Sequence, residues 1–225
     1  MCSSDLLYIT SNLLIYFFKY DIGGAGWNAN YVLFNTFGGG IQIISMMLFY
    51  PLFRKFISAM QVFYVSFVMA IGGYAVLLAL MFTNRTNIYI LMIPGFFIFT
   101  AFGMLTVLTT VFLANTVDYG ELKNNRRDES VIFSMQTFVV KLASGVAAMI
   151  ASICLTISNI SNDTSTEAAA MVSDSYTSVA VLRMTMTVLP IIGLLVAVFI
   201  FAKKYILTDE KLGEINQELA HRHKA

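Results

Sequence analysis

The segment from Asp118 to Lys141 reads DYGELKNNRRDESVIFSMQTFVVK. Its first half carries three basic and four acidic side chains between two long apolar runs, and Lys141 lies about ten residues into the second run. At a helical rise of ~1.5 Å per residue, Lys141 is about 15 Å deep, near the middle of a ~30 Å hydrocarbon core. An ionisable group is costly at that depth unless it faces a polar cavity or a partner. The segment therefore predicts membrane helices and a lysine with a function.

The composition of the whole chain agrees with a membrane environment. Of 225 residues, 58% are hydrophobic and 12% are charged, and the mean hydropathy is +0.75, whereas soluble domains are about 25% charged. The net charge of +1 argues against a nucleic-acid partner, which requires a concentrated basic face. The few candidate ligands, Cys2, Cys154, His221 and His223, are too scattered for a metal cluster or a catalytic triad. We expect no enzyme, no metal site and no cofactor.

Six apolar runs predict an all-α membrane protein, with six transmembrane helices in residues 1–202 and a cytoplasmic tail over 203–225. The runs cover about residues 6–20, 31–50, 57–82, 88–117, 131–158 and 176–202. Five of them are ~20 residues or longer, as a spanning helix requires. The first has only ~15 residues, about 22 Å of helix, so we expect the sequence to begin inside a helix. In the tail, Leu212, Ile215 and Leu219 recur at helical intervals and predict a short helix.

The positions of lysine and arginine predict the orientation. Ten of the fourteen basic residues follow the second, fourth and sixth runs, on one side of the membrane. Cytoplasmic loops carry an excess of Lys and Arg. The sequence therefore predicts a multi-pass protein of the plasma (cytoplasmic, inner) membrane with both termini in the cytoplasm.

The fifth run has two different faces. On a helical wheel of ~100° per residue, Gln136, Thr137, Lys141 and Ser144 fall between about 0° and 140°. Seven apolar side chains fall between about 200° and 300°: Val131, Met135, Phe138, Val139, Leu142, Val146 and Met149. A helix of this kind turns its polar face to a water-filled cavity, where amide, hydroxyl and ammonium groups can bind the hydroxyls of a sugar. Alternatively, Lys141 pairs with an acidic side chain of another helix. The predicted spans contain no Asp or Glu at mid-depth, so its partner would be substrate, water or a carboxylate outside this sequence.

The charged residues before this run allow two interpretations. Asp118, Glu121, Arg126 and Glu129, together with Lys123, can form charge-assisted bridges at the cytoplasmic ends of the helices. Two such arrangements of similar energy would make a gate that locks one conformation and releases another. An ordinary solvated loop is the alternative, and the spacing alone does not decide between them.

The same residues carry a resemblance. The run Asp118-Tyr-Gly-Glu121, followed by Lys123, Arg126, Glu129 and the run from Gln136 to Lys141, resembles the signature of the glycoside-pentoside-hexuronide:cation symporter family. The similarity extends to residues 16–23 at the end of the first run, to the basic loop around Arg54 and to Leu189-Pro190 in the last run. It thus covers nearly the whole chain.

The resemblance implies a major-facilitator architecture of twelve spans in two six-helix halves, of which this chain would be the C-terminal half. In that family a sugar binds between the halves, and a coupled cation, Na⁺ or H⁺, binds carboxylates of the N-terminal half. By position, Gln136, Thr137 and Lys141 correspond to substrate-binding residues, and Asp118, Glu121, Arg126 and Glu129 correspond to a cytoplasmic gate.

The partners implied are a sugar or glycoside, membrane lipid, and either the N-terminal six-helix half or a second copy of this chain. The resulting activity would be cation-coupled sugar transport by alternating access. A homodimeric sugar facilitator without ion coupling, in which each copy supplies one half, is the alternative.

Overall fold

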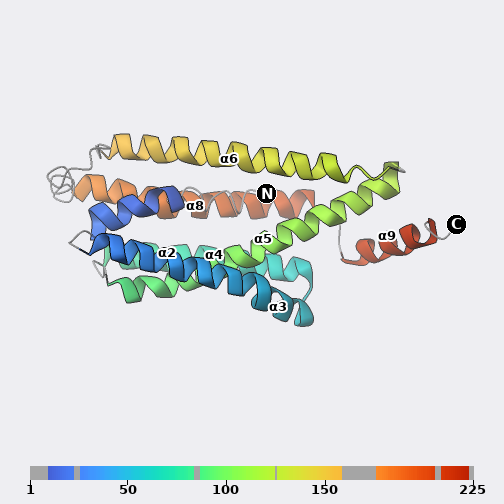
Figure 1. The fold of residues 1–225 in the computed structure, drawn as a ribbon, viewed down its shortest axis with the longest axis horizontal. Helices are drawn as coiled ribbons and strands as arrows, with labels where there is room; N and C mark the ends of the chain where they lie inside the picture. The colour runs from blue at the N-terminus through green and yellow to red at the C-terminus, as the bar shows by residue number, and fades with distance from the viewer. Residues whose placement is uncertain are drawn as a thin grey trace.

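The protein is helical throughout the residues that the computed structural model describes, which are 10–22, 26–83, 87–124, 126–158, 176–205 and 209–222. Residues 10–16 are α-helical and continue directly into a π-helical segment. The elements in chain order are η1 (Phe17–Ile22), α2 (Trp27–Ile44), η2 (Ser45–Phe49), α3 (Tyr50–Phe56), α4 (Ala59–Phe82), α5 (Ile88–Asn124), α6 (Glu129–Ile157), α8 (Tyr176–Lys204) and α9 (Asp209–Arg222). Figure 1 shows an elongated bundle with α6 along one side and α9 apart at one end.

Five helical stretches within the described residues are long and apolar enough to cross a membrane, namely Trp27–Phe56, Ala59–Phe82, Ile88–Asn124, Glu129–Ile157 and Val179–Lys204. Each overlaps one of the last five predicted runs. The first run begins at residue 6, and its residues 6–9 lie outside the described residues. The described part, 10–22, is shorter than the ~20 residues that a span needs. The described part of the chain is therefore helical and contains five candidate membrane spans.

The end of α5 differs from the sequence prediction. The apolar run ends at Val117, but the helix continues through Asp118 and Glu121 to Asn124. Hydropathy marks where a helix leaves the membrane rather than where it ends, and Glu, Leu and Lys are good helix formers in water. With 37 residues, α5 is about 55 Å long and exceeds a ~30 Å hydrocarbon core. Most of the predicted loop is thus a helical extension beyond the membrane.

The extension of α5 also supports the tail. The tail helix α9 covers most of the segment in which the leucine and isoleucine spacing predicts a helix. Its buried Ile215 packs with Leu212 and with Tyr119 and Leu122 of α5, and Tyr205 completes this small cluster. Nothing is described for the side chain of Leu219. The α5 extension and α9 therefore form a second, smaller packing unit at the end of the bundle (Figure 1).

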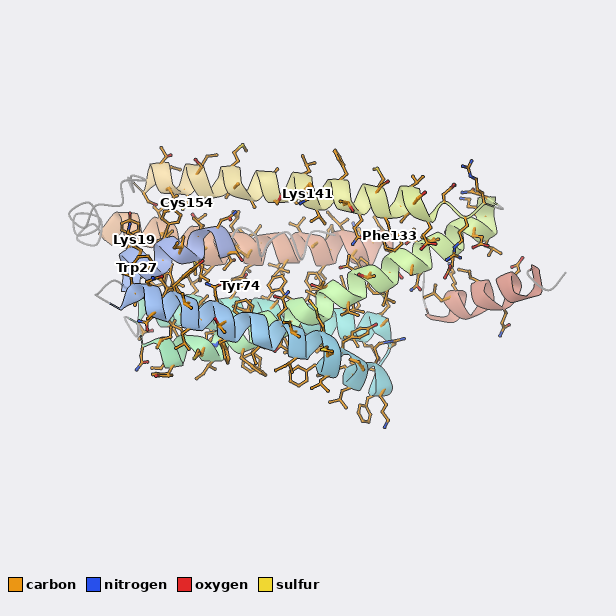
Figure 2. All side chains as sticks on the ribbon, viewed as in Figure 1. Lys19, Trp27, Tyr74, Phe133, Lys141 and Cys154 are labelled. Atoms are coloured by element: carbon orange, nitrogen blue, oxygen red, sulfur yellow. The ribbon has the colours of Figure 1, made fainter. Side chains whose placement is uncertain are left out.

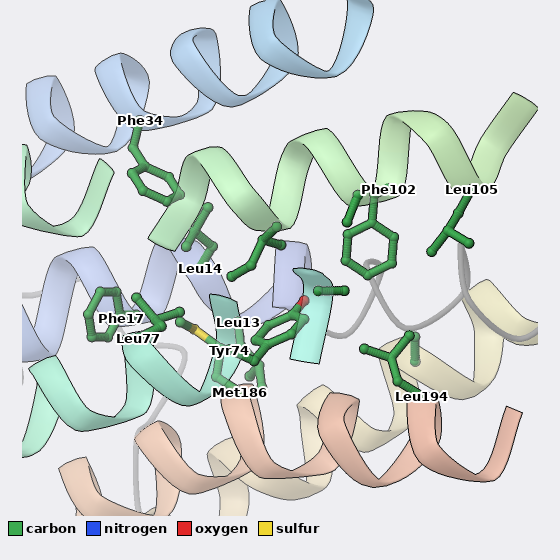
Figure 3. Close-up of a cluster of buried hydrophobic side chains, with 14 of the residues drawn as sticks. Leu13, Leu14, Phe17, Phe34, Tyr74, Leu77, Phe102, Leu105, Met186 and Leu194 are labelled. Carbon is green, nitrogen blue, oxygen red and sulfur yellow. The ribbon is translucent and has the colours of Figure 1, made fainter. Parts of the chain in front are cut away.

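The main core joins helices that are far apart in the sequence. Tyr74 of α4 is fully buried, and its hydroxyl shares a hydrogen bond of 2.8 Å with Thr10 Oγ1 of the first helix. Figure 3 shows Tyr74 among Leu13, Met186 and other buried apolar side chains of the first helix, α4, α5 and α8. Because its hydroxyl has a partner, a tyrosine can occupy the centre of this apolar cluster at little cost.

Glycines allow α5 to pack closely against α4 and α2. A Cβ on Gly73 of α4 would lie 2.7 Å from Ile98 Cγ1 and 3.2 Å from the Pro94 carbonyl oxygen, both on α5. A Cβ on Gly103 of α5 would lie 2.7 Å from the Gln42 carbonyl oxygen of α2. Small residues of this kind allow the backbones of membrane helices to come close. The paired glycine Gly72, by contrast, faces open space.

Candidate functional site

Much of α6 lies open to its surroundings. Its buried residues, Ala147, Ala151, Cys154 and Leu155, all belong to its second half. The first half, which carries the predicted substrate-binding residues, is exposed or only partly buried. Figure 1 shows α6 beside α8, meeting the end of α5 only at its own start. The helix therefore presents its first half to something other than the described part of this chain.

The predicted polar face lies within this open half. Gln136 is half-buried, and Thr137 and Lys141 are exposed. Thr137 Oγ1 donates to the Phe133 carbonyl oxygen at 3.0 Å, and Ser144 Oγ donates to the Lys141 carbonyl oxygen at 2.8 Å. Figure 2 shows Lys141 near the middle of α6. The Lys141 ammonium makes no ion pair with any side chain that the structure describes, so the alternative of a structural partner within the chain gains no support from these residues.

The apolar face of α6 is exposed as well. The side chains predicted to face lipid include Met135, Phe138, Leu142 and Met149, and Phe138 is 60% exposed. Large apolar side chains in such a row are stable in contact with hydrocarbon but not with water. The two exposed faces of the first half thus differ in chemistry, as the helical wheel predicts.

The cavity beside the first helix is too small for a sugar. A cavity between the first helix, α2, α4 and α5 has a volume of about 30 Å³ and is bordered by Thr10, Ser11 and Asn35. This volume accommodates about one water molecule. A sugar therefore needs an open surface of this chain, such as the polar face of α6, rather than this closed cavity.

Arg127 gathers the charged residues between α5 and α6. Its Nη1 donates to Glu121 Oε2 at 2.8 Å and to Asp118 Oδ1 at 3.3 Å, and its Nε donates to Glu129 Oε2 at 3.2 Å. Asp118 and Glu121 lie one turn apart on the α5 extension, and Glu129 is the first residue of α6. We call these four residues the Arg127 cluster. It ties the end of one helix to the start of the next.

Arg126, which the sequence comparison places in the gate, lies elsewhere. Its Nε is 2.8 Å from Asp128 Oδ1, and its side chain is 79% exposed. The structure therefore brings together three of the four predicted gate residues, and the arginine that joins them is Arg127. Adjacent residues of an irregular link point in different directions, and spacing alone does not indicate which guanidinium turns back toward α5.

The carboxylates of the Arg127 cluster change the pKa of Arg127. Hydrogen bonds to Glu121 and then Glu129 raise the pKa of the Arg127 guanidinium above its usual value. A raised pKa means that the stability contributed by the charged form of Arg127 is fully present below the usual arginine pKa and is lost as the pH rises through the still higher folded-state pKa. Arg127 therefore stays charged over the whole physiological pH range. The cluster is open to solvent, so salt weakens it.

A buried ion pair was not foreseen from the sequence. Arg183 of α8 donates from Nε and Nη2 to the two carboxylate oxygens of Asp21 at 2.7 and 2.6 Å. The Asp21 side chain is 2% exposed and that of Arg183 9%. Such bidentate geometry offsets much of the cost of burying two charges. One signal was available: Asp21 follows the first apolar run and Arg183 lies near the start of the last, so the two lie at the same predicted side of the membrane.

Proteins of similar sequence are known, and the names of several concern sugar transport. A family model described as MFS/sugar transport protein matches residues 6–209. The chain is 32% identical over 211 residues to a lactose permease of Lactobacillus delbrueckii subsp. bulgaricus, covering 92% of this chain and 31% of the relative. It is 28% identical over 218 residues to a raffinose carrier protein of Pediococcus pentosaceus, covering 94% and 31%.

A third relative is an uncharacterized symporter of Bacillus subtilis, 24% identical over 213 residues, which cover 94% of this chain and 42% of the relative. The chain spans about a third of the length of the first two relatives. The proteins that it resembles are thus named as permeases and carriers, in agreement with the resemblance noted from residues 118–141. The match of the family model over most of the sequence shows that this chain belongs to the MFS/sugar transport protein family.

Proposed function

We propose that this chain forms one wall of the substrate pathway in a sugar or glycoside transporter that works by alternating access. In this proposal it corresponds to the C-terminal six-helix half of a twelve-helix transporter, with both termini in the cytoplasm. The sugar binds between the two halves, and a Na⁺ or H⁺ gradient drives its accumulation through carboxylates of the other half. The named activities of the lactose and raffinose relatives support a sugar as substrate.

The position of Lys141 is the strongest support for this proposal. Lys141 lies near the middle of a membrane-length helix, on an open face, without an ion pair to any described side chain. A charge in that position is costly unless it meets water or a polar partner. Gln136 and Thr137 lie on the same side of the helix and supply an amide and a hydroxyl oxygen. We infer that Gln136 and Thr137 bind sugar hydroxyls and that Lys141 sets the electrostatics of the site.

The Arg127 cluster supplies the second part of the proposal. It joins the α5 extension to the start of α6 through Asp118, Glu121 and Glu129. A solvent-exposed network of this kind can exchange partners at low cost, because exposed ion pairs contribute only about 0–1 kcal/mol each. We infer that it acts as the cytoplasmic gate, with Arg127 in the place that the sequence comparison gives to Arg126.

The substitution Lys141→Val in the complete transporter tests the substrate site. We expect sugar accumulation to fall to the background level of cells without the transporter, because the cavity loses its charge. The amount of protein in the membrane should stay unchanged, since removing a charge from a membrane helix favours insertion. Uptake of radiolabelled lactose and raffinose, with membrane protein measured by immunoblot, gives both quantities.

The matched control is Phe138→Val, which trims a side chain on the lipid-facing side of the same helix. It should accumulate sugar close to the normal level. If Lys141→Val also accumulated sugar normally, the proposed role of this face would be wrong. A loss of uptake in both variants would indicate damage to α6 rather than to a substrate site.

The homodimeric facilitator remains a second candidate because the open face of α6 would suit a second copy as well as a different half. The two candidates differ in energetics. Coupled transport concentrates the sugar and collapses when the Na⁺ and H⁺ gradients are dissipated with ionophores, whereas a facilitator only equilibrates it. Accumulation that survives the ionophores unchanged would exclude coupling to either cation.

A further inference from the structure

A second cavity, with a volume of about 310 Å³, is bordered by residues of α4, α5 and α8 together with Tyr205. Its α4 and α8 residues belong to the start of α4 and the end of α8, which lie at the same end of the bundle in Figure 1. This volume is at the lower limit of the ~300–1,000 Å³ typical of small-molecule sites. It is ten times larger than the water-sized cavity near Thr10, so it can hold an organic group.

The walls of this cavity are mainly aromatic. Phe63 of α4 stacks on Phe201 of α8 with ring centroids 4.1 Å apart, and Phe112 of α5 lies 5.3 Å from Phe201. Three hydroxyl-bearing residues also border the space, Thr109, Thr116 and Tyr205. The two threonines donate to their own helix, Thr109 to the Leu105 carbonyl oxygen and Thr116 to the Phe112 carbonyl oxygen, both at 2.8 Å. A sugar needs several free donors and acceptors, so this lining favours a hydrocarbon chain.

A single charge stands at one end. Lys204, the last residue of α8, borders the cavity, and Ala197 lies two turns earlier on the same helix. Ala197 and Lys204 are seven positions apart, about 10 Å at ~1.5 Å per residue. On α5, Thr109 and Thr116 are also seven positions apart. The cavity is therefore mainly apolar and about two helical turns long, with a lysine among its lining residues at one end, and this combination is complementary to an amphipathic anion.

Lys203, next to Lys204 in the sequence, lies outside the cavity lining. Its Nζ lies 4.5 Å from the centre of the Phe199 ring. Phe199 and the cavity residue Ile200 are 61% and 53% exposed. These side chains continue the apolar outer surface of α8, which fits hydrocarbon rather than water. The cavity thus has an edge on the surface that faces lipid, from which an acyl chain can enter sideways.

We propose that this cavity binds one acyl chain of an anionic phospholipid, with the lipid phosphate paired to Lys204. The aromatic walls between α4, α5 and α8 hold the hydrocarbon, and the ammonium at the end of α8 selects the charge of the headgroup. The lipid fills the gap that these three helices leave and so fixes the end of α8 against α4. This site is separate from the polar face of α6 and does not depend on the function proposed for that face.

The test uses the complete transporter, purified in detergent, and native mass spectrometry with two lipids of identical acyl chains, phosphatidylglycerol and phosphatidylcholine. We expect one phosphatidylglycerol to bind more tightly than phosphatidylcholine. Lys204→Gln should weaken phosphatidylglycerol about fivefold, the effect of one basic residue near an anionic lipid, and weaken phosphatidylcholine less, because the choline of that lipid offsets the charge of its phosphate. Lys203→Gln, the adjacent control, should leave both lipids unchanged.

A second pair of variants tests the hydrocarbon part. Ala197→Leu extends a side chain into the cavity and should weaken both lipids, whereas Val196→Leu, on the exposed surface of α8, should weaken neither. Thermal unfolding of all four variants identifies any that have lost the fold, and the two pairs are independent of each other.

Four results would overturn the proposal. Equal losses in Lys203→Gln and Lys204→Gln would indicate a diffuse attraction between lipid and lysines. Displacement of the lipid by glycerol phosphate, which has no acyl chain, would indicate an anion site, and displacement by lactose or raffinose would indicate a sugar site. A dimer that disappears in Ala197→Leu without any change in lipid binding would make the cavity an interface between copies.

Discussion

At the scale of single residues, two neighbouring arginines have different surroundings. Arg127 donates to Asp118, Glu121 and Glu129, while Arg126 pairs with Asp128 and is largely exposed. Asp118 and Glu121 are side by side on the α5 extension because residues three apart share a helix face. One guanidinium, with its several fixed donors, can bind both and still reach the start of α6.

Replacing each arginine in turn separates these roles. Arg127→Gln should release the start of α6 from the α5 extension, and we expect a several-fold increase in amide hydrogen exchange over residues 118–131. Arg126→Gln removes an exposed pair, which contributes about 0–1 kcal/mol, and should leave the exchange unchanged. Hydrogen exchange with mass spectrometry measures both.

Salt provides an independent check on this prediction. At ~1 M salt the Debye length is ~3 Å, so the unmodified protein should approach the exchange rates of Arg127→Gln. Equal exchange in the two variants at low salt would show that the cluster does not restrain the link between α5 and α6.

At the scale of elements, the close contact between α4 and α5 depends on one of two adjacent glycines. Gly73 faces Pro94 and Ile98 of α5, and Gly72 points one residue further round the helix, into open space. Adjacent residues differ by about 100° on a helix, so only one member of such a pair can face a given neighbour. Gly73 therefore sets the distance between two spans, whereas Gly72 does not.

Gly73→Ala should destabilise the protein because the added methyl group meets the Pro94 carbonyl oxygen and Ile98. Overpacking of this kind costs about 1–3 kcal/mol, partly offset by the ~0.5–1 kcal/mol by which Ala is favoured over Gly in a helix. Gly72→Ala gains helix propensity without overpacking, so the stability of the protein should stay the same or rise. Thermal unfolding in detergent compares the two, and a lower melting temperature for Gly72→Ala than for Gly73→Ala would contradict the observed packing.

At the scale of the whole molecule, α6 is attached to the rest of the chain mainly through its second half, where Ala147, Ala151, Cys154 and Leu155 are buried. The first half exposes one polar and one apolar face. Lipid can cover the apolar face, but a helix cannot place both faces against hydrocarbon at low cost. The proposed transporter resolves this by enclosing the polar face in a water-filled pathway between two halves.

Cysteine labelling in membranes tests this arrangement. In the complete transporter with Cys2→Ser and Cys154→Ala, Thr137→Cys should react with a charged, membrane-impermeant thiol reagent, because a thiolate forms only where water reaches it. Phe138→Cys, one residue further along, should react at least tenfold more slowly, since we expect it to face lipid. Bound sugar should slow the labelling at position 137, and equal rates at the two positions would exclude a water-filled pathway along this face.

The membrane class, the helical fold, the five candidate spans and the two faces of α6 could be predicted from the sequence. These features follow from hydropathy and helical periodicity, which are properties of neighbouring residues. Hydropathy placed the end of α5 too early, because Asp118 to Asn124 lie beyond the apolar run but are still helical.

Which side chains meet could be seen only once the helices were placed against one another. The tertiary structure placed Arg127 rather than Arg126 among the three carboxylates, paired Asp21 with Arg183 across 162 positions, and turned Gly73 rather than Gly72 toward α5. Each of these contacts depends on the rotation of one helix and its distance from another. Those quantities are set by packing over the whole bundle, and the order of residues along one helix does not contain them.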